Sequence, residues 1–214
     1  MPGSGFPWEQ KTPLNFMNIE ISQDCTHINV LFSGGADSTL LSYLLLKQHP
    51  ETSLTLHFMK HRLDFQSPFM YDCHAWLENH FNKKIHLNIW GKTFIRPAVE
   101  SILLDFPGYV YTGCNKVPEN EFTPSVYIPY DTPPVRGSVF NDFHKRPFID
   151  LLKPEIYKIY HKENILDLFS LTFSCGAPKK QENRVAACGG CFFCMERDWA
   201  VKNNINNTQT PRSV

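Results

Sequence analysis

The sequence predicts an α/β fold in which a mostly parallel sheet is sandwiched by helices. Short apolar runs rich in β-branched residues, typical of buried parallel strands, recur along the first half of the chain. Between them lie longer segments whose apolar residues follow helical spacing. Strand and helix signals that alternate in this way favour right-handed crossovers with helices on both faces. A cysteine-rich segment near the C-terminus interrupts the pattern and indicates a small additional module.

The expected elements alternate regularly up to residue 112. Leu40, Leu41, Leu44 and Leu45 recur at helical spacing after a Gly-Gly turn, and Pro97 is an expected early-turn residue of the third helix. We expect strands at 28–32, 54–58, 85–90 and 109–112, and helices at 38–48, 69–81 and 93–106.

The second half of the chain has a different character. Residues 117–147 hold six prolines and several aromatic residues, which predicts a long ordered loop or a lid. Helical spacing returns over residues 153–169. We therefore expect a leader and edge segment at 1–27, the α/β domain at 28–150, a helical module at 151–203 and a flexible tail at 204–214.

Composition limits the classes of function. The 214 residues suffice for one domain with a small appendage, and 21 basic residues balance 21 acidic ones. That balance gives no global attraction to nucleic acid or to anionic membranes, so we expect neither as a partner. The chain has no apolar run of the ~20 residues that a membrane span needs. The N-terminus lacks the layout of a signal peptide, and we expect a cytoplasmic protein.

The segment Ser33-Gly34-Gly35-Ala36-Asp37-Ser38-Thr39 joins the first expected strand to the first expected helix. Two glycines let the backbone turn tightly and bring its amides close to a ligand. The hydroxyl groups add donors, and the following helix directs its positive end at the loop. Together these features predict an anion site of pyrophosphate size at the carboxyl end of a parallel strand.

Asp37 is the unusual member of this loop, because a carboxylate repels phosphate. It fits if it holds Mg²⁺ between phosphate oxygens, or if it caps the helix. The loop is not a Walker P-loop, since no Gly-Lys-Ser/Thr follows, and it lacks Gly-x-Gly-x-x-Gly. An ordinary Gly-Gly turn with a polar N-cap is the alternative.

Four of the seven cysteines lie between residues 175 and 194, with the spacing Cys175-x12-Cys188-x2-Cys191-x2-Cys194. Four thiolates are the ligand set of a structural Zn²⁺ site, and Gly189 and Gly190 permit the tight turn between them. We predict structural zinc. Two disulfides, an iron–sulfur cluster and a redox Cys-x-x-Cys are the alternatives.

The loop at 33–38 resembles the Ser-Gly-Gly-x-Asp-Ser signature of the PP-loop ATP pyrophosphatases, and Thr112-Gly113-Cys114-Asn115 resembles their second glycine site. The resemblance implies a PP-loop/HUP-like, Rossmann-like fold that cleaves ATP, with Mg²⁺, to AMP and pyrophosphate while adenylating a substrate. It implies catalytic roles for Ser33, Asp37 and Ser38. It implies ATP contacts from Phe32, Ser33, Gly34, Gly35, Ala36, Asp37, Ser38, Thr39 and Gly113, with His57 and Phe58 flanking the base or simply packing in the strand.

The combination of this loop with the cysteine cluster is similar to the QueC family, the 7-cyano-7-deazaguanine (preQ0) synthases. Residues 147–156 resemble that family's Pro-Leu-x-x-Leu-x-Lys-x-Glu-Ile segment, and residues 171–175 its Thr-Trp-Ser-Cys. The likeness implies adenylation of 7-carboxy-7-deazaguanine, amide formation with ammonia, and dehydration to the nitrile. It also implies a homodimer. The family's substrate-binding pattern has no counterpart in residues 116–130, and Asn115, Lys116 and Phe122 are the candidate substrate contacts in this chain.

Three other functions stay open on the sequence. The first is a QueC-like enzyme with a different base or amine acceptor. The second is another adenylating PP-loop enzyme, such as a tRNA thiolase, for which Cys114 is the candidate catalytic cysteine, although a packed thiol is the simpler interpretation. The third is a nucleotide-binding protein without catalysis, against which the intact Ser33, Asp37 and Ser38 argue.

Overall fold

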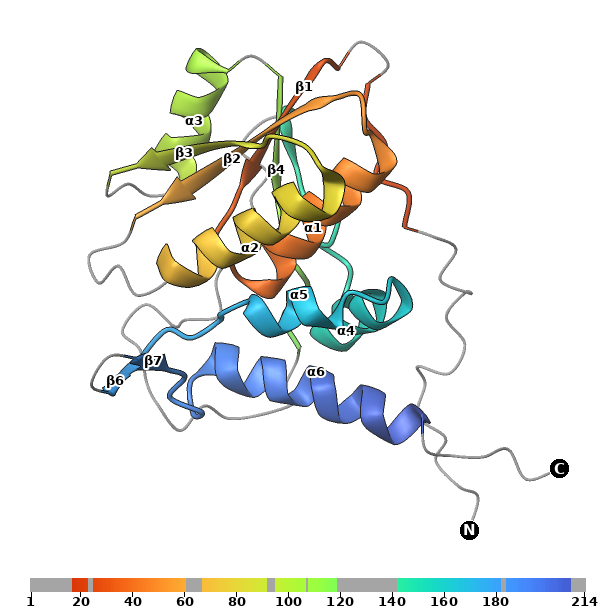
Figure 1. The fold of residues 1–214 in the computed structure, drawn as a ribbon, viewed down its shortest axis with the longest axis vertical. Coiled ribbons are helices and arrows are strands. Elements are labelled where there is room, and N and C mark those ends of the chain that lie inside the picture. The colour runs from red at the N-terminus through yellow and green to blue at the C-terminus, as the bar shows by residue number, and fades with distance from the viewer. Residues whose placement is uncertain are drawn as a thin grey trace, which may run out of the picture.

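The structure, a computed structural model, describes residues 17–22, 25–60, 67–91, 95–106, 108–118, 142–181 and 184–208. Its centre is a sheet with the strand order β3-β2-β1-β4-β5, in which every neighbouring pair runs parallel (Figure 1). The predicted α/β class with a parallel sheet is confirmed. The strands are β1 (His27–Leu31), β2 (Ser53–Met59), β3 (His86–Trp90), β4 (Tyr109–Thr112) and β5 (His144–Lys145).

Helices cover both faces of the sheet because its strands bury side chains on both sides. Along β1, Ile28 and Val30 pack into one apolar cluster, and Leu31 packs into the other. The larger cluster includes side chains of α1 (Ala36–Gln48) and α2 (Ser67–Phe81). The smaller one is formed with α3 (Ile95–Asp105), on the opposite face.

A second layer of helices lies outside α1 and α2 (Figure 1). It contains α4 (Lys153–Lys162), α5 (Leu166–Leu171) and α6 (Phe192–Thr208), with a small antiparallel hairpin of β6 (Lys179–Gln181) and β7 (Arg184–Ala186). Ile156 and Leu168 bring α4 and α5 into the larger core cluster. Helix α4 begins with Pro154 in its first turn, and the Glu155 carboxylate accepts the Leu152 N–H at 2.7 Å.

The single helical stretch expected over 153–169 is wrong, because the structure divides it into α4 and α5. Asn164 lies between them with φ +57°, a left-handed conformation that asparagine tolerates better than most residues. Strand β5 was missed inside the region expected to be a loop or lid. It has two residues, too few for a periodic pattern, and is held partly by the contact between His144 Nε2 and Thr112 Oγ1 at 2.9 Å.

Helix α6 continues to Thr208, past residue 204, where we expected the tail to begin. Asn203 and Asn204 are poor helix formers, but their amides donate to backbone carbonyls of Trp199, Ala200 and Pro154 and so stabilise the last turns. Residues 209–214 lie outside the described residues, as do 1–16 and 23–24 of the leader and 119–141 of the expected loop.

The described part of the leader packs on the C-terminal end of α1. Ile19 is buried in the core, and its N–H donates to Gln48 Oε1 at 2.8 Å. Gln48 Nε2 donates in turn to the carbonyl of Met17 at 2.7 Å. Within the described ranges, no helix combines the length and apolar character that a membrane crossing requires.

Candidate functional site: a cavity at the carboxyl ends of the central strands

A cavity of about 410 Å³ lies at the carboxyl ends of β1, β2 and β4. Since β1 has β2 on one side and β4 on the other, the chain order reverses there, and open α/β sheets bind ligands at such a point. The predicted site residues that line the cavity are Phe32, Ser33, Gly35, Asp37, Ser38, His57, Gly113 and Asn115. Gly34, Ala36, Thr39, Phe58 and Lys116 are not among its lining residues, and Phe122 lies outside the described residues.

The loop at 33–38 folds around its own hydroxyl groups. Ser33 N–H donates to Ser38 Oγ at 3.1 Å, and the two hydroxyl oxygens lie 3.0 Å apart. Gly35 N–H donates to Ser33 Oγ at 3.2 Å. Gly34 has φ +71°, which favours glycine, and a Cβ there would stand 2.8 Å from Met70 Cα. The turn therefore directs the N-terminus of α1 at the cavity.

Gly113 brings the segment after β4 against the start of α1. A Cβ at this position would lie 2.6 Å from the Ser38 nitrogen and 2.7 Å from the Asp37 carbonyl carbon. No side chain fits in that space. The two predicted glycine segments are therefore in direct contact, which their separation in the sequence did not indicate.

Asp37 pairs with a lysine that we did not predict as a site residue. The N-cap position of α1 belongs to Gly35, which has no side chain, and Asp37 lies in the first turn. Lys153 Nζ donates to the two Asp37 carboxylate oxygens at 2.6 and 2.5 Å. Lys153 is the first residue of α4, is 5% exposed and lines the cavity. Lys153 belongs to the segment 147–156 that resembles the QueC family, and this was the one indication in the sequence that it is a site residue.

A third charged group joins this pair from α6. Glu196 Oε2 lies 3.4 Å from Lys153 Nζ, and Glu196 Oε1 accepts a hydrogen bond from Asn115 Nδ2 at 3.3 Å. Both Glu196 and Asn115 are buried. Lys153, which lines the cavity, therefore lies between two carboxylates, Asp37 in the cavity wall and Glu196 buried behind it. Nothing in the sequence spacing indicated the contribution of Glu196.

His57 lies at the end of β2 with both ring nitrogens engaged by the protein. Trp90 Nε1–H donates to His57 Nδ1 at 3.0 Å, so the ring proton is on Nε2, which donates to Asn29 Oδ1 at 2.9 Å. Burial, with the nearby His27 and His86, lowers the pKa of His57 to about 4. The imidazole is thus neutral and presents its ring to the cavity. Phe58 points to the other face, into the larger core cluster, because neighbouring strand residues alternate.

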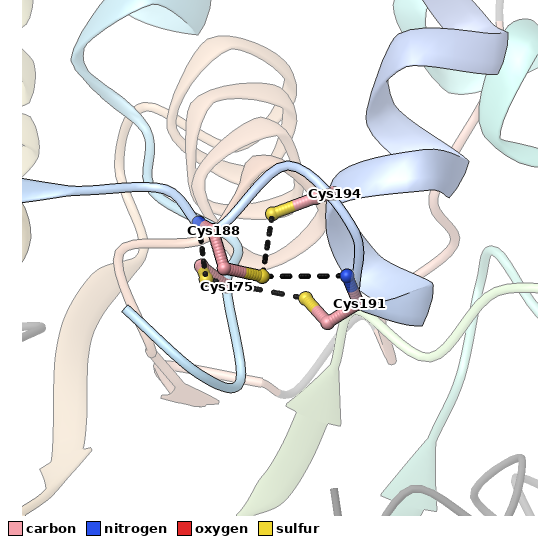
Figure 2. A group of neighbouring side chains, drawn as sticks. All are labelled: Cys175, Cys188, Cys191 and Cys194. Atoms are coloured by element: carbon pink, nitrogen blue, oxygen red, sulfur yellow. Dashed lines mark hydrogen bonds between the residues drawn. The ribbon is translucent and has the colours of Figure 1, made fainter. Parts of the chain in front are cut away.

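The four cysteines of the C-terminal segment come together as predicted (Figure 2). Their sulfur atoms all lie within 4.8 Å of one another, and none forms a disulfide. The Sγ atoms of Cys188 and Cys194 are 3.9 Å apart, as are those of Cys175 and Cys191. Zinc–sulfur bonds of ~2.3 Å in a tetrahedron place the sulfurs ~3.8 Å apart. The cluster therefore fits a single tetrahedral metal ion such as zinc.

The chemistry of these thiols fits a cation as well. Burial raises the pKa of Cys175 and of Cys194, whereas for Cys188 the amides of Gly190 and Cys191 outweigh burial and lower the pKa to about 7. Four neighbouring thiolates repel one another, so all four could be ionised together only with a cation bound between them. In a four-iron cluster each cysteine binds a different iron, which would spread the sulfurs further apart than they are here.

The cysteine module also forms one wall of the cavity. The N–H of Phe173 donates to the carbonyl of Gly34 at 3.0 Å, and Ser174 Oγ would stand 3.2 Å from a Cβ on Gly35. Phe173, Ser174 and Cys175 all line the cavity. The segment that leads into the four cysteines is therefore in direct contact with the loop at 33–38.

Comparisons with known proteins give structural likeness only. No protein-family model and no curated protein matches the chain. Solved structures that resemble it include the U34-tRNA thiolase NcsA of Methanococcus maripaludis with its 4Fe-4S cluster, at 12% identity over 88% of this chain and 69% of that one. They also include the NH3-dependent NAD synthetase of Campylobacter jejuni, at 19% identity over 69% of this chain and 68% of that one, and the NMN synthetase of Francisella tularensis, at 10% identity over 88% and 80%. Each has a TM-score of 0.45, too low to support a functional argument.

Proposed function

We propose that this chain is an ATP-dependent adenylating enzyme of the PP-loop type, which cleaves ATP to AMP and pyrophosphate. The observation that carries the proposal is the position of the loop at 33–38. It opens α1 at the point where the strand order reverses, and it borders a cavity of about 410 Å³. An anion site at that position takes the phosphates of a nucleotide.

Each group at the loop has a role in this reaction. Ser33, Ser38 and the free amides of α1 bind the phosphate oxygens, and Lys153 neutralises charge that develops as pyrophosphate leaves. Asp37 has the carboxylate that a magnesium ion bound to ATP prefers, and its side chain keeps 20% exposure toward the cavity. His57, which is neutral and has both nitrogens engaged, flanks the adenine through its ring rather than by hydrogen bonds.

The chemistry that follows is acyl activation. A substrate carboxylate attacks the α-phosphorus, pyrophosphate leaves, and the acyl-adenylate carries AMP as a good leaving group. The protein positions two anions and screens their repulsion.

We further propose that the substrate is a QueC-type carboxylate, 7-carboxy-7-deazaguanine, and that ammonia displaces AMP on the way to the nitrile. Three family-like segments border one cavity, through Ser33, Lys153 and Cys175. Asn115 lines the same cavity and remains a proposed substrate contact. In this proposal the four-cysteine site holds structural zinc, and the chain acts as a cytoplasmic homodimer.

One observation favours a second candidate, sulfur transfer. Cys114 is half-buried and lines the cavity two residues after β4. A thiol there lies within reach of an activated acceptor. Loss of a sulfur-transfer activity in Cys114→Ala, with ATP cleavage retained, would favour this candidate, whereas a Cys114→Ala protein with wild-type amide formation would exclude it.

The proposal is tested by mixing the protein with ATP, Mg²⁺ and 7-carboxy-7-deazaguanine, with and without ammonium. We expect AMP release that depends on the carboxylate, and mass spectrometry should find the amide and nitrile when ammonium is present. Pyrophosphate release with another acceptor would keep the ATP chemistry and overturn the substrate. A protein that binds ATP without cleaving it would be a nucleotide-binding protein that lacks catalysis.

A further inference from the structure

Glu196 is a charged residue that the proposed chemistry does not use. It lies in the second turn of α6, two residues after Cys194, and is 0% exposed. Its carboxylate faces Lys153 at 3.4 Å and accepts a hydrogen bond from Asn115 at 3.3 Å. A buried carboxylate is unfavourable unless it is paired and hydrogen-bonded, and Lys153 and Asn115 provide such partners for Glu196.

The lysine between the two carboxylates is shared unequally. Lys153 Nζ lies 2.5 and 2.6 Å from the Asp37 oxygens and 3.4 Å from Glu196 Oε2. Both Asp37 oxygens are therefore engaged by the lysine. If Asp37 is to bind the magnesium of MgATP, the ammonium has to turn away from it and toward the phosphates.

We propose that Glu196 is a positioning residue that holds Lys153 in the cavity while Asp37 exchanges the lysine for the magnesium of MgATP. The inference rests on the proposed ATP chemistry. Glu196 shares the positive charge of Lys153, which weakens the hold of Lys153 on Asp37 and makes that carboxylate available to the incoming cation. Once the ammonium of Lys153 has turned away from Asp37, Glu196 keeps it beside the phosphates.

The net charge of Asp37, Lys153 and Glu196 also favours binding of the magnesium ion with the nucleotide. With Asp37, Lys153 and Glu196 ionised, the cluster carries one net negative charge. A cluster with a net negative charge next to the cavity attracts a cation and repels free ATP, so we expect nucleotide binding to depend strongly on magnesium. Glu196→Gln keeps the shape of the side chain, removes one negative charge and leaves Asp37 as the carboxylate partner of Lys153 within the cluster.

Glu196→Gln is therefore expected to change the magnesium dependence of nucleotide binding while it leaves the fold intact. Binding of α,β-methylene-ATP, which cannot be cleaved to AMP and pyrophosphate, is measured by titration calorimetry at low and at saturating Mg²⁺. We expect about tenfold weaker binding at low Mg²⁺, the size of one charge-assisted hydrogen bond, and less than about twofold at saturation. The Mg²⁺ concentration that half-saturates ATP cleavage should rise in parallel.

Asp198→Asn is the matched control, because Asp198 is an exposed carboxylate on the same helix. Its binding curves should coincide with those of the wild type. If Glu196→Gln does not fold, Glu196→Asp decides, since it keeps the charge but withdraws it by one methylene, and about threefold weaker binding at low Mg²⁺ is expected.

Two results would overturn the inference, and they differ. A Glu196 variant that folds and whose magnesium dependence matches Asp198→Asn would refute the role of Glu196 while the ATP chemistry stands. A wild-type protein that neither binds the analogue nor cleaves ATP at any Mg²⁺ concentration would refute the proposed function and this inference with it.

Discussion

Replacing Gly113 by alanine pushes a methyl group into the backbone at the start of α1. The added Cβ would lie 2.6 Å from the Ser38 nitrogen, whereas contacts under 3.0 Å are essentially never found for real Cβ atoms. The start of α1 or the segment after β4 must therefore shift until this contact lengthens from 2.6 Å to at least 3.0 Å. Overpacking of this kind destabilises by ~1–3 kcal/mol. Because the displaced amides are the proposed phosphate ligands, we also expect at least about tenfold weaker MgATP binding.

Gly91→Ala provides the matched control, because a Cβ at Gly91 meets no atom within 4 Å. Urea unfolding gives the change in stability, and titration calorimetry gives the MgATP affinity. The reasoning would be refuted if Gly113→Ala matched Gly91→Ala in both measurements, since the contact between the two glycine segments would then be irrelevant to binding.

Three other predictions concern zinc binding, the loss of stability at acidic pH and the packing of the leader segment. Cys191→Ser should reduce bound zinc, measured by mass spectrometry, from about one ion per chain to none and lower the melting temperature. Burial lowers the pKa of both His57 and His144 to about 4, so the unfolded chain binds more protons than the folded one between pH 6.5 and 4. The free energy of unfolding should therefore decrease as the pH is lowered through this range, by up to about 1.4 kcal/mol per pH unit for each histidine. His57→Gln should remove one such contribution, and an unchanged pH slope in urea melts would contradict this. Gln48→Ala should destabilise by ~1–2 kcal/mol in urea melts because two hydrogen bonds to the leader are lost, whereas a wild-type midpoint would show that the leader does not depend on Gln48.

Local patterns were enough to predict the strands and the two motifs. Buried parallel strands read as continuous apolar runs, so β1 to β4 were placed within a residue or so of their observed ends. The loop at 33–38 and the four cysteines have short, fixed spacings that carry their own geometry. In each case the information lies within about twenty residues of sequence.

The missing parts depend on contacts between distant segments. Lys153 meets Asp37 across 116 residues, and Glu196 meets Asn115 across 81. Neither pair leaves a periodic signal. Strand alternation predicts that only one of the neighbouring residues His57 and Phe58 can face the cavity. The structure shows that this residue is His57, whereas Phe58 packs in the larger core cluster.

The most direct test of the central claim is the identity of the products formed from ATP. Phosphorus NMR of a reaction that contains the protein, Mg²⁺, ATP and the carboxylate substrate distinguishes cleavage between the α- and β-phosphates from loss of the γ-phosphate. We predict AMP and pyrophosphate, and their absence with Asp37→Asn, because that carboxylate is the proposed magnesium ligand beside the loop. ADP and inorganic phosphate as the products, or cleavage that persists in Asp37→Asn, would contradict the account.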